Sequence, residues 1–174
     1  MDLTDEKLKS IELVLLDVDG VLTDGSIVYD DAKNETKTFN VKDGFGIRLL
    51  MKSGVQVGIV TGRSSMALRH RCDDLGIALL FDGVKDKAAL LPRIMELTGV
   101  SESRIAFVGD DLPDLPIMKK VGLAVAVGDG HELVREHAHM TTRASGGKGA
   151  VREVCEAILV AKGMWNSLCE SFLV

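Results

Sequence analysis

Short apolar runs alternate along the chain with longer segments whose apolar positions recur at helical spacing. The runs are rich in residues that favour β-strands and cover 13–16, 55–60, 79–81, 105–108 and 123–127. Because they are continuously apolar, they are typical of parallel strands that helices cover on both faces. The pattern predicts an α/β fold with a doubly wound, Rossmann-like parallel sheet.

Residues that commonly cap helices mark the ends of the predicted helices. Ser64 can cap a helix that ends just before Gly76, and Asp43 can cap an earlier one. Pro92 falls inside the helical stretch 87–97, so we expect a kink or a late helix start there.

One segment interrupts the alternation of strands and helices. Two β-rich runs, SIVYD and ETKTFNV, flank the polar sequence DAKN and predict a β-hairpin flap at about 26–41. Two strands alone are marginal in water, so the flap needs something to pack against, and flaps of other subunits would supply it. A decorative surface hairpin is the alternative.

Length and composition narrow the class of protein. The 174 residues predict one domain, 1–174, with a C-terminal tail at about 163–174. No apolar run approaches the roughly 20 residues of a membrane span, and the acidic, polar N-terminus indicates a cytoplasmic protein. The net charge of -5 disfavours nucleic acid as a partner. Cys72, Cys155 and Cys169 lie far apart and predict reduced thiols, with neither a disulfide framework nor a zinc site.

Two carboxylates, Asp17 and Asp19, directly follow the first predicted strand. In open α/β sheets, ligands bind beyond the carboxyl ends of the strands. Side chains two positions apart project the same way from extended backbone, and Gly20 lets the chain turn sharply after them. Both acids can therefore face one crevice, one as a nucleophile and the other as a proton carrier.

A second acidic group follows the predicted strand 105–108 and should reach the same edge of the sheet. It contains Asp110, Asp111 and Asp114 in the sequence GDDLPD. Mg²⁺ prefers a few carboxylates, waters and substrate phosphate as ligands, and Asp17, Asp110 and a backbone carbonyl suit it. The ion would also offset the repulsion between these acids and an approaching phosphate.

Two further strand ends carry groups that suit phosphoryl transfer. The strand 55–60 runs into Thr61 and Arg63, where a hydroxyl and an amide near a helix start can hold phosphoryl oxygens. Lys87 follows the next predicted strand and supplies a cation for the transition state. Each feature alone is weak, since acids after a strand often cap turns, but the four strand ends together indicate a phosphatase.

These motifs resemble those of the haloacid dehalogenase superfamily of phosphatases over nearly the whole chain. More narrowly, the resemblance is to the branch that hydrolyses 3-deoxy-D-manno-octulosonate 8-phosphate in lipopolysaccharide synthesis. It rests on DVDGVLTDG, FNVKDGFGI, TGR, GVKDK, GDDLPDLPIM and GGKGAVREVC. The branch is capless and tetrameric, so the resemblance implies a Mg²⁺-dependent phosphomonoester hydrolase whose flaps and neighbouring subunits enclose the site.

The resemblance also implies roles for the acids. Asp17 would be the nucleophile, while Asp19 would protonate the leaving sugar oxygen and then activate water, so that one hard displacement becomes two easier ones. Asp17, the carbonyl of Asp19 and Asp110 would bind Mg²⁺. Asp111 and Asp114 would support these groups from behind.

Thr61 and Lys87 would hold the transferring phosphoryl group. The expected substrate is a sugar acid, and a bidentate arginine is the natural reader of its carboxylate, for which we expect Arg63. Further substrate contacts, some from a neighbouring subunit, are implied for Asp19, Asn40, Val41, Lys42, Asp43, Gly44, Arg48, Arg71 and Lys87. Lys42 stands where the family often has arginine, which keeps the charge but loses the planar fork. Solvated helix faces are the alternative for Arg48 and Arg71.

Other readings of the sequence remain open. A phosphatase of the same branch could act on a nine-carbon nonulosonate 9-phosphate, but a glutamate in place of Arg63 would suit that substrate better. A receiver-type signalling module would store the phosphoryl group, whereas Asp19 promotes its hydrolysis. A catalytically idle subunit should lack one of the motifs. The segment 146–149 is either a simple turn or, by the resemblance, lies near a neighbouring active site.

Overall fold

A six-stranded parallel sheet forms the centre of the protein. The structure is a computed structural model that describes residues 3–173. The strand order is β5-β4-β1-β6-β7-β8, which confirms the doubly wound α/β fold. The strands are β1 (Leu13–Leu16), β4 (Gln56–Val60), β5 (Leu79–Phe81), β6 (Ile105–Gly109), β7 (Leu123–Ala126) and β8 (Met140–Thr141).

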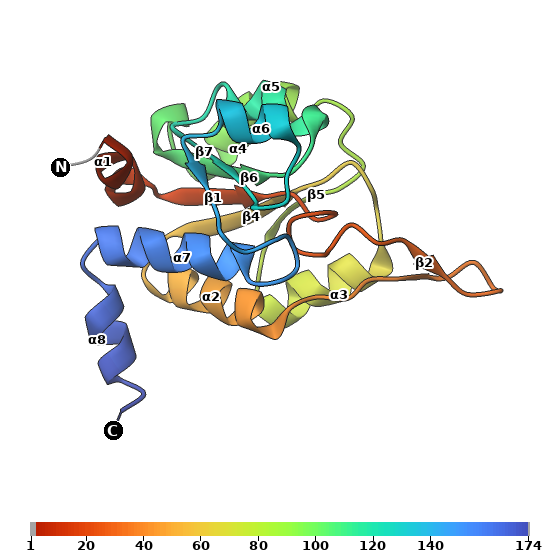
Figure 1. Cartoon of the computed structure of the whole chain (residues 1–174), viewed down its shortest axis with the longest axis horizontal. Helices are drawn as coiled ribbons and strands as arrows, with labels where there is room; N and C mark the ends of the chain where they lie inside the picture. Colours follow the sequence, from red (N-terminus) through yellow and green to blue (C-terminus); the bar gives the residue numbers. More distant parts are fainter. Residues whose placement is uncertain (1–2, 174) are drawn as a thin grey trace.

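Helices cover both faces of the sheet (Figure 1). One layer holds α2 (Val41–Lys52), α3 (Met66–Leu75) and α7 (Ala150–Ala161), and the other holds α4 (Lys87–Thr98), α5 (Leu115–Met118) and α6 (Glu132–His137). The remaining helical pieces are α1 (Leu3–Ser10), α8 (Trp165–Glu170), η1 (Glu102–Arg104) and η2 (Leu112–Asp114). Along β1, Val14 and Leu16 pack into the first layer and Leu13 and Leu15 into the second. Burial on both faces explains why the strand is apolar throughout.

The predicted flap is an antiparallel hairpin of β2 (Val28–Tyr29) and β3 (Glu35–Thr36). Its turn is closed by Asp30, whose carboxylate accepts a hydrogen bond of 2.8 Å from the amide of Asn34. The strands are shorter than the sequence pattern suggests, and the hairpin projects away from the body of the molecule (Figure 1). Residues 17–40, between β1 and α2, hold only this hairpin and its connections, in place of a cap domain.

Several element boundaries differ from those expected. Ser65, not Ser64, precedes α3, and its side chain makes no capping hydrogen bond. Asn40, not Asp43, caps α2, because α2 begins earlier than expected. The alternative of a late start at Pro92 is wrong, since α4 already begins at Lys87 and continues through the proline.

Asp43 instead serves a different helix. It is buried on α2 and accepts a 2.7 Å hydrogen bond from the amide of Arg152 in the first turn of α7. A side chain of α2 thus caps the start of α7, and this pairing cannot be read from the spacing of residues in the sequence. In the C-terminal tail, Trp165 packs against the core and Phe172 lies edge-on to Phe45. Within residues 3–173, no helix is long and apolar enough to cross a membrane.

The position of β1 determines where ligands can bind. The chain adds β4 and β5 on one side of β1 and then β6, β7 and β8 on the other. The crevice at the carboxyl ends of the strands where the order reverses is the usual ligand site of such sheets. The loops that leave β1, β4 and β6 meet at this point.

Candidate active site

A pocket of about 500 Å³ lies over the carboxyl ends of the central strands. It brings together residues that follow β1, β4, β5 and β6 and are far apart in the sequence. Its lining consists of Asp17, Asp19, Thr61, Gly62, Arg63, Val84, Lys85, Lys87, Asp110, Asp111, Pro113 and Asp114. The sequence placed most of these polar residues at one sheet edge, and the structure shows how closely they approach.

A buried lysine links two of the acids. The Lys87 ammonium lies 2.8 Å from Oδ2 of Asp17 and 2.6 Å from Oδ1 of Asp114. It enters from the first residue of α4 and passes over the ring of Phe107. Burial alone would lower the pKa of Lys87, but the two carboxylates outweigh it and raise that pKa. The lysine therefore keeps its charge next to Asp17.

Asp114 is fully engaged by the protein itself. Its Oδ1 bonds to Lys87, and its Oδ2 accepts hydrogen bonds from the amides of Asp110 at 3.0 Å and Asp111 at 3.4 Å. Asp111 completes a capping box with Asp114 at the start of η2. Asp114 therefore fixes the loop that carries Asp110.

Asp110 holds an oxygen that no protein group satisfies. Its Oδ1 is buried and has no hydrogen-bond partner among the described residues. Its carboxylate lies over Gly20, where an added Cβ would be 2.1 Å from Oδ2.

One oxygen each from Asp17, Asp110 and Asp114 lie within 4.8 Å of one another. Asp17 is also engaged, since its Oδ1 accepts a 2.7 Å hydrogen bond from the amide of Val18 and its Oδ2 lies against Lys87, but each of its oxygens has one partner and keeps a lone pair. Oδ2 of Asp114 already accepts two hydrogen bonds, so Asp17 and Asp110 are the side chains better able to hold a hard cation.

Burial and mutual repulsion raise the pKa values of two of these acids, Asp17 and Asp110. Burial, with a smaller contribution from Asp114, raises the pKa of Asp17 to about 6, although Lys87 acts in the opposite direction. Burial and then Asp114 and Asp17 raise the pKa of Asp110 to about 7. A divalent cation between Asp17 and Asp110 would relieve this repulsion and bring both acids into their charged forms.

Thr61 is held at the end of β4 by backbone bonds on both sides. Its amide donates to the carbonyl of Phe81 at 2.9 Å, and its carbonyl accepts from the amide of Val84 at 3.0 Å. The residue is buried and lines the pocket beside Asp17 and Lys87. Its hydroxyl accepts a long hydrogen bond of 3.5 Å from the amide of Arg63, and the side chain forms part of the pocket wall.

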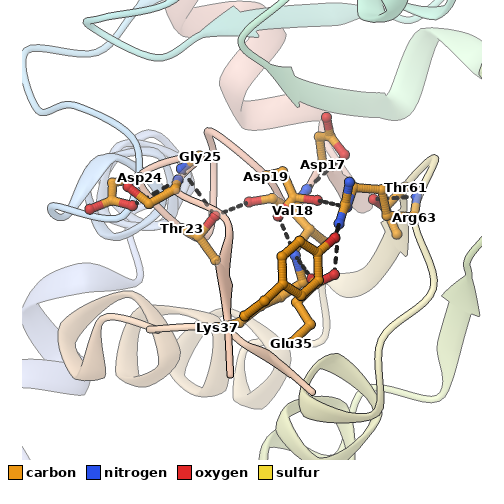
Figure 2. Close-up of polar contacts among 12 residues, drawn as sticks. Asp17, Val18, Asp19, Thr23, Asp24, Gly25, Glu35, Lys37, Thr61 and Arg63 are labelled. Carbon is orange, nitrogen blue, oxygen red and sulfur yellow. Dashed lines mark hydrogen bonds and ion pairs between the residues drawn. The ribbon is translucent and has the colours of Figure 1, made fainter. Parts of the chain in front are cut away.

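The flap reaches the pocket through charged side chains that the sequence analysis did not single out (Figure 2). The ammonium of Lys37 bonds to Oδ1 of Asp19 and lies 2.8 Å from Oε1 of Glu35. The guanidinium of Arg63 lies 2.6 Å from Oε2 of Glu35 and 3.1 Å from the hydroxyl of Tyr29. Sequence patterns do not predict these ion pairs, because the pairs depend on where the base of the hairpin lies relative to the loop after β1.

The other expected substrate contacts lie outside this pocket. Asn40, Val41 and Lys42 line a second pocket of about 460 Å³ with Gly147 and Lys148. There the amide of Gly147 donates to the carbonyl of Val21 at 2.9 Å, so the segment 146–149 packs on the turn after β1 of its own chain.

Two arginines and a glycine on α2 and α3, also expected as substrate contacts, are not among the residues that line that second pocket. Arg71 donates to the carbonyl of Asn40 at 3.3 Å and lies against Gly44. Arg48 is exposed and donates to the carbonyl of Asp74 at the end of α3. Within one chain, these residues do not join the pocket that holds Asp17.

Comparisons with known proteins identify the family to which the chain belongs. Residues 82–154 match the haloacid dehalogenase-like hydrolase family. The 3-deoxy-D-manno-octulosonate 8-phosphate phosphatase KdsC of Escherichia coli K12 is 46% identical over 90% of this chain and 84% of its own length.

Two solved structures extend the similarity to the fold. The same phosphatase of Moraxella catarrhalis, in complex with a magnesium ion, a phosphate ion and a KDO molecule, has 40% identity and a TM-score of 0.94, covering 97% of both chains. The cobalt-bound enzyme of Haemophilus influenzae has 40% identity and a TM-score of 0.92, covering 97% of this chain and 99% of its own.

Proposed function

The chain belongs to the haloacid dehalogenase-like hydrolases, in the branch of the 3-deoxy-D-manno-octulosonate 8-phosphate phosphatases, and we propose that it hydrolyses that sugar acid phosphate. The observation that carries the proposal is the arrangement at the end of β1. Asp17 lies 2.8 Å from the Lys87 ammonium, and one of its oxygens lies within 4.8 Å of an oxygen of Asp110, whose Oδ1 is unsatisfied. An attacking carboxylate, a cation for phosphate oxygens and a metal ligand thus meet in one pocket. The product would serve lipopolysaccharide biosynthesis.

In the first step, a carboxylate oxygen of Asp17 attacks phosphorus. The bond between phosphorus and the sugar oxygen breaks, and its electron pair leaves with that oxygen, which takes a proton from Asp19. Lys87 and Thr61 hold the phosphoryl oxygens during the transfer. The free sugar acid and an aspartyl-phosphate result.

In the second step, water attacks the phosphorus of the aspartyl-phosphate. Asp19, now a carboxylate, takes a proton from the water, and the bond between phosphorus and Asp17 breaks. Inorganic phosphate leaves and the carboxylate of Asp17 is restored. Asp19 is thus an acid in one step and a base in the other.

The oxygen ligands of the pocket fit Mg²⁺. The side chains of Asp17 and Asp110 would hold the ion together with the carbonyl of Asp19, and the buried Oδ1 of Asp110 is a ligand that lacks any other partner among residues 3–173. When bound, Mg²⁺ supplies positive charge that balances the acids and the phosphate. Asp111 and Asp114 keep the ligands in place from behind.

Arg63 is the proposed reader of the sugar carboxylate. Its side chain is 40% exposed at the mouth of the pocket, so its guanidinium can still receive a planar anion.

Asn40, Val41 and Lys42 of the second pocket would contribute further substrate contacts together with Gly44, Arg48 and Arg71, some of them to the site of a neighbouring subunit. This requires a homo-oligomer. Asp43, also expected as a contact, is buried and bonded to the amide of Arg152, so it would hold this segment on α7 instead.

The assembly we propose is a homotetramer in the cytoplasm, with flaps packed together. Ile27, Val28 and Tyr29 support it, since these apolar side chains are 51%, 53% and 58% exposed on the flap. Burying them against other flaps would stabilise a hairpin whose strands have only two residues each.

The proposed function is tested by phosphate release from 3-deoxy-D-manno-octulosonate 8-phosphate. We expect release with Mg²⁺, none with EDTA, and recovery when Mg²⁺ is restored. Asp17→Asn should fold but release no phosphate, because the nucleophile and one metal charge are gone. Turnover retained by Asp17→Asn would contradict the covalent mechanism, and an absence of metal-dependent release by the wild type would contradict the function.

A further inference from the structure

Four charged side chains at the mouth of the pocket form a closed ring of ion pairs, called here the flap ring: Asp19, Glu35, Lys37 and Arg63. Lys37 bonds to Oδ1 of Asp19 and to Oε1 of Glu35. Arg63 bonds to Oε2 of Glu35, and its Nε lies 3.6 Å from Oδ2 of Asp19. Two members come from the flap and two from the loops after β1 and β4 (Figure 2).

Lys37 is the most deeply buried member of the flap ring. Its side chain is 3% exposed, against 17% for Glu35, 21% for Asp19 and 40% for Arg63. A lysine on a projecting hairpin could keep its ammonium in water, so burying it is costly unless partners compensate. Asp19 and Glu35 are those partners, and they keep Lys37 charged.

The two carboxylate oxygens of Asp19 have different contacts in the flap ring. Oδ1 is held by the Lys37 ammonium. Oδ2 is buried and accepts no hydrogen bond from any residue that the structure describes, although Nε of Arg63 lies 3.6 Å from it. Fixing one oxygen sets the rotation of the carboxyl group and leaves the other to exchange a proton in the pocket.

We propose that Lys37 is a positioning residue that orients Asp19 for proton transfer, and that Glu35 holds Lys37 and Arg63 in place around it. The proposal rests on the proposed function, in which Asp19 carries the proton. Lys37 directly follows β3 at the base of the hairpin, so the base of the flap, and not its projecting tip, aligns the proton carrier.

The test compares two phosphate esters whose leaving groups differ in their need for a proton. The sugar oxygen of the 8-phosphate leaves as a poor alkoxide and needs Asp19, whereas p-nitrophenolate leaves without help. The ratio kcat/KM reports the steps up to the first phosphoryl transfer. For Lys37→Met we expect kcat/KM to fall about 100-fold on the 8-phosphate and less than about 3-fold on p-nitrophenyl phosphate.

The later step gives a second readout. Water activation by Asp19 is needed whichever ester is used, so kcat of Lys37→Met should fall on both whenever hydrolysis of the aspartyl-phosphate limits turnover. Asp19→Asn should show the same pattern more strongly. Lys37→Arg should restore part of the loss, because a cation again reaches Asp19.

Matched variants separate positioning from stability. Lys33→Met removes the same charge from the exposed turn of the same hairpin. It should leave kcat/KM unchanged for both the 8-phosphate and p-nitrophenyl phosphate. Glu35→Gln should also lower kcat/KM more on the 8-phosphate than on p-nitrophenyl phosphate, but by less than Lys37→Met. If Lys37→Met does not fold, Glu35→Gln takes its place in the comparison. Equal losses of kcat/KM on the two esters, or no loss, would overturn the positioning role. A wild type that cleaves neither ester would instead overturn the proposed function.

Discussion

At the scale of single residues, the pocket holds more negative than positive charge. Lys87 bonds to Asp17 and Asp114, but no lysine or arginine is paired with Asp110 among residues 3–173. Burial raises the pKa of Asp110 to about 7, above the value of about 6 for Asp17. The metal-free protein should therefore be destabilised by this carboxylate whenever it is charged.

Asp110→Asn should raise the melting temperature of the metal-free protein at alkaline pH. The pKa of Asp110 in the folded protein, about 7, lies above the ordinary aspartate value of 3.8. Between these values the folded state binds more protons than the unfolded state, so stability falls as pH rises. The loss of folding stability caused by the charged Asp110 carboxylate is complete above about pH 7 and vanishes toward about pH 4. In EDTA we expect the melting temperature of Asp110→Asn to exceed that of the wild type by a few degrees at alkaline pH and to equal it in acid.

Asp111→Asn is the control for this variant, because asparagine keeps the cap of η2 and the exposed carboxylate of Asp111 is less confined. Its melting temperature should change little with pH relative to the wild type. Mg²⁺ should stabilise the wild type but not Asp110→Asn. A gain for Asp110→Asn that is equal in acid and alkali would argue against the charge of Asp110 as its cause.

Arg63→Ala should weaken recognition of the carboxylate. A charged hydrogen bond contributes about 1.5–3 kcal/mol, so kcat/KM for the 8-phosphate should fall about 10- to 100-fold. A hexose 6-phosphate has a similar alkoxide leaving group but no carboxylate, and its slower hydrolysis should fall much less. Arg69→Ala, at an exposed ion pair on α3, is the control. Equal losses on both sugars would contradict carboxylate recognition and would mean that Arg63 serves the phosphate or the flap ring.

At the scale of elements, the sequence pattern predicted the buried strands well and the edges poorly. β1, β4, β5, β6 and β7 were predictable, because most lie between two helix layers and are apolar throughout. β8 was missed, since this edge strand has two residues, pairs only with β7 and is partly exposed. The cap at Asn40 was also missed, because Asp43 nearby is an equally good capping residue whose partner lies on α7.

The same reasoning explains which parts of the candidate site could be predicted. Parallel strands end at one edge, so the meeting of Asp17, Thr61, Lys87 and Asp110 follows from their places after strands. The part played by Lys37 could not be predicted, because the fold of the hairpin over the pocket is set by tertiary contacts.

Gly20 shows how the turn after β1 shapes the metal site. Its φ is +88°, and a Cβ there would lie 2.1 Å from Oδ2 of Asp110. Gly20→Ala should displace Asp110 and weaken Mg²⁺ binding at least about 10-fold, as supporting contacts of metal ligands commonly do. Titration of phosphate release with Mg²⁺ measures this.

The control is Gly54→Ala, where φ is +91° but no atom lies within 4 Å of an added Cβ. It carries the same backbone strain without the collision, so its Mg²⁺ dependence should be that of the wild type. Equal effects of the two variants would show that strain, and not the contact with Asp110, controls the site.

At the scale of the whole molecule, the flap projects from the body (Figure 1), and its apolar side chains Ile27 and Val28 are exposed. Val28→Lys should convert the proposed tetramer to smaller species, because a lysine cannot be buried there without a partner. Light scattering after size exclusion gives the mass. Leu97→Lys, which changes a side chain of similar exposure on α4, should leave the mass unchanged. A wild type that is monomeric would contradict the assembly.

The most direct test of the whole account is a comparison of kcat/KM, with Mg²⁺, for 3-deoxy-D-manno-octulosonate 8-phosphate, a nonulosonate 9-phosphate and a hexose 6-phosphate. We predict a strong preference for the eight-carbon sugar acid, because Arg63 reads its carboxylate while Asp17 attacks its phosphate. Preference for the nine-carbon substrate, or similar values for all three, would contradict the substrate assigned to this protein.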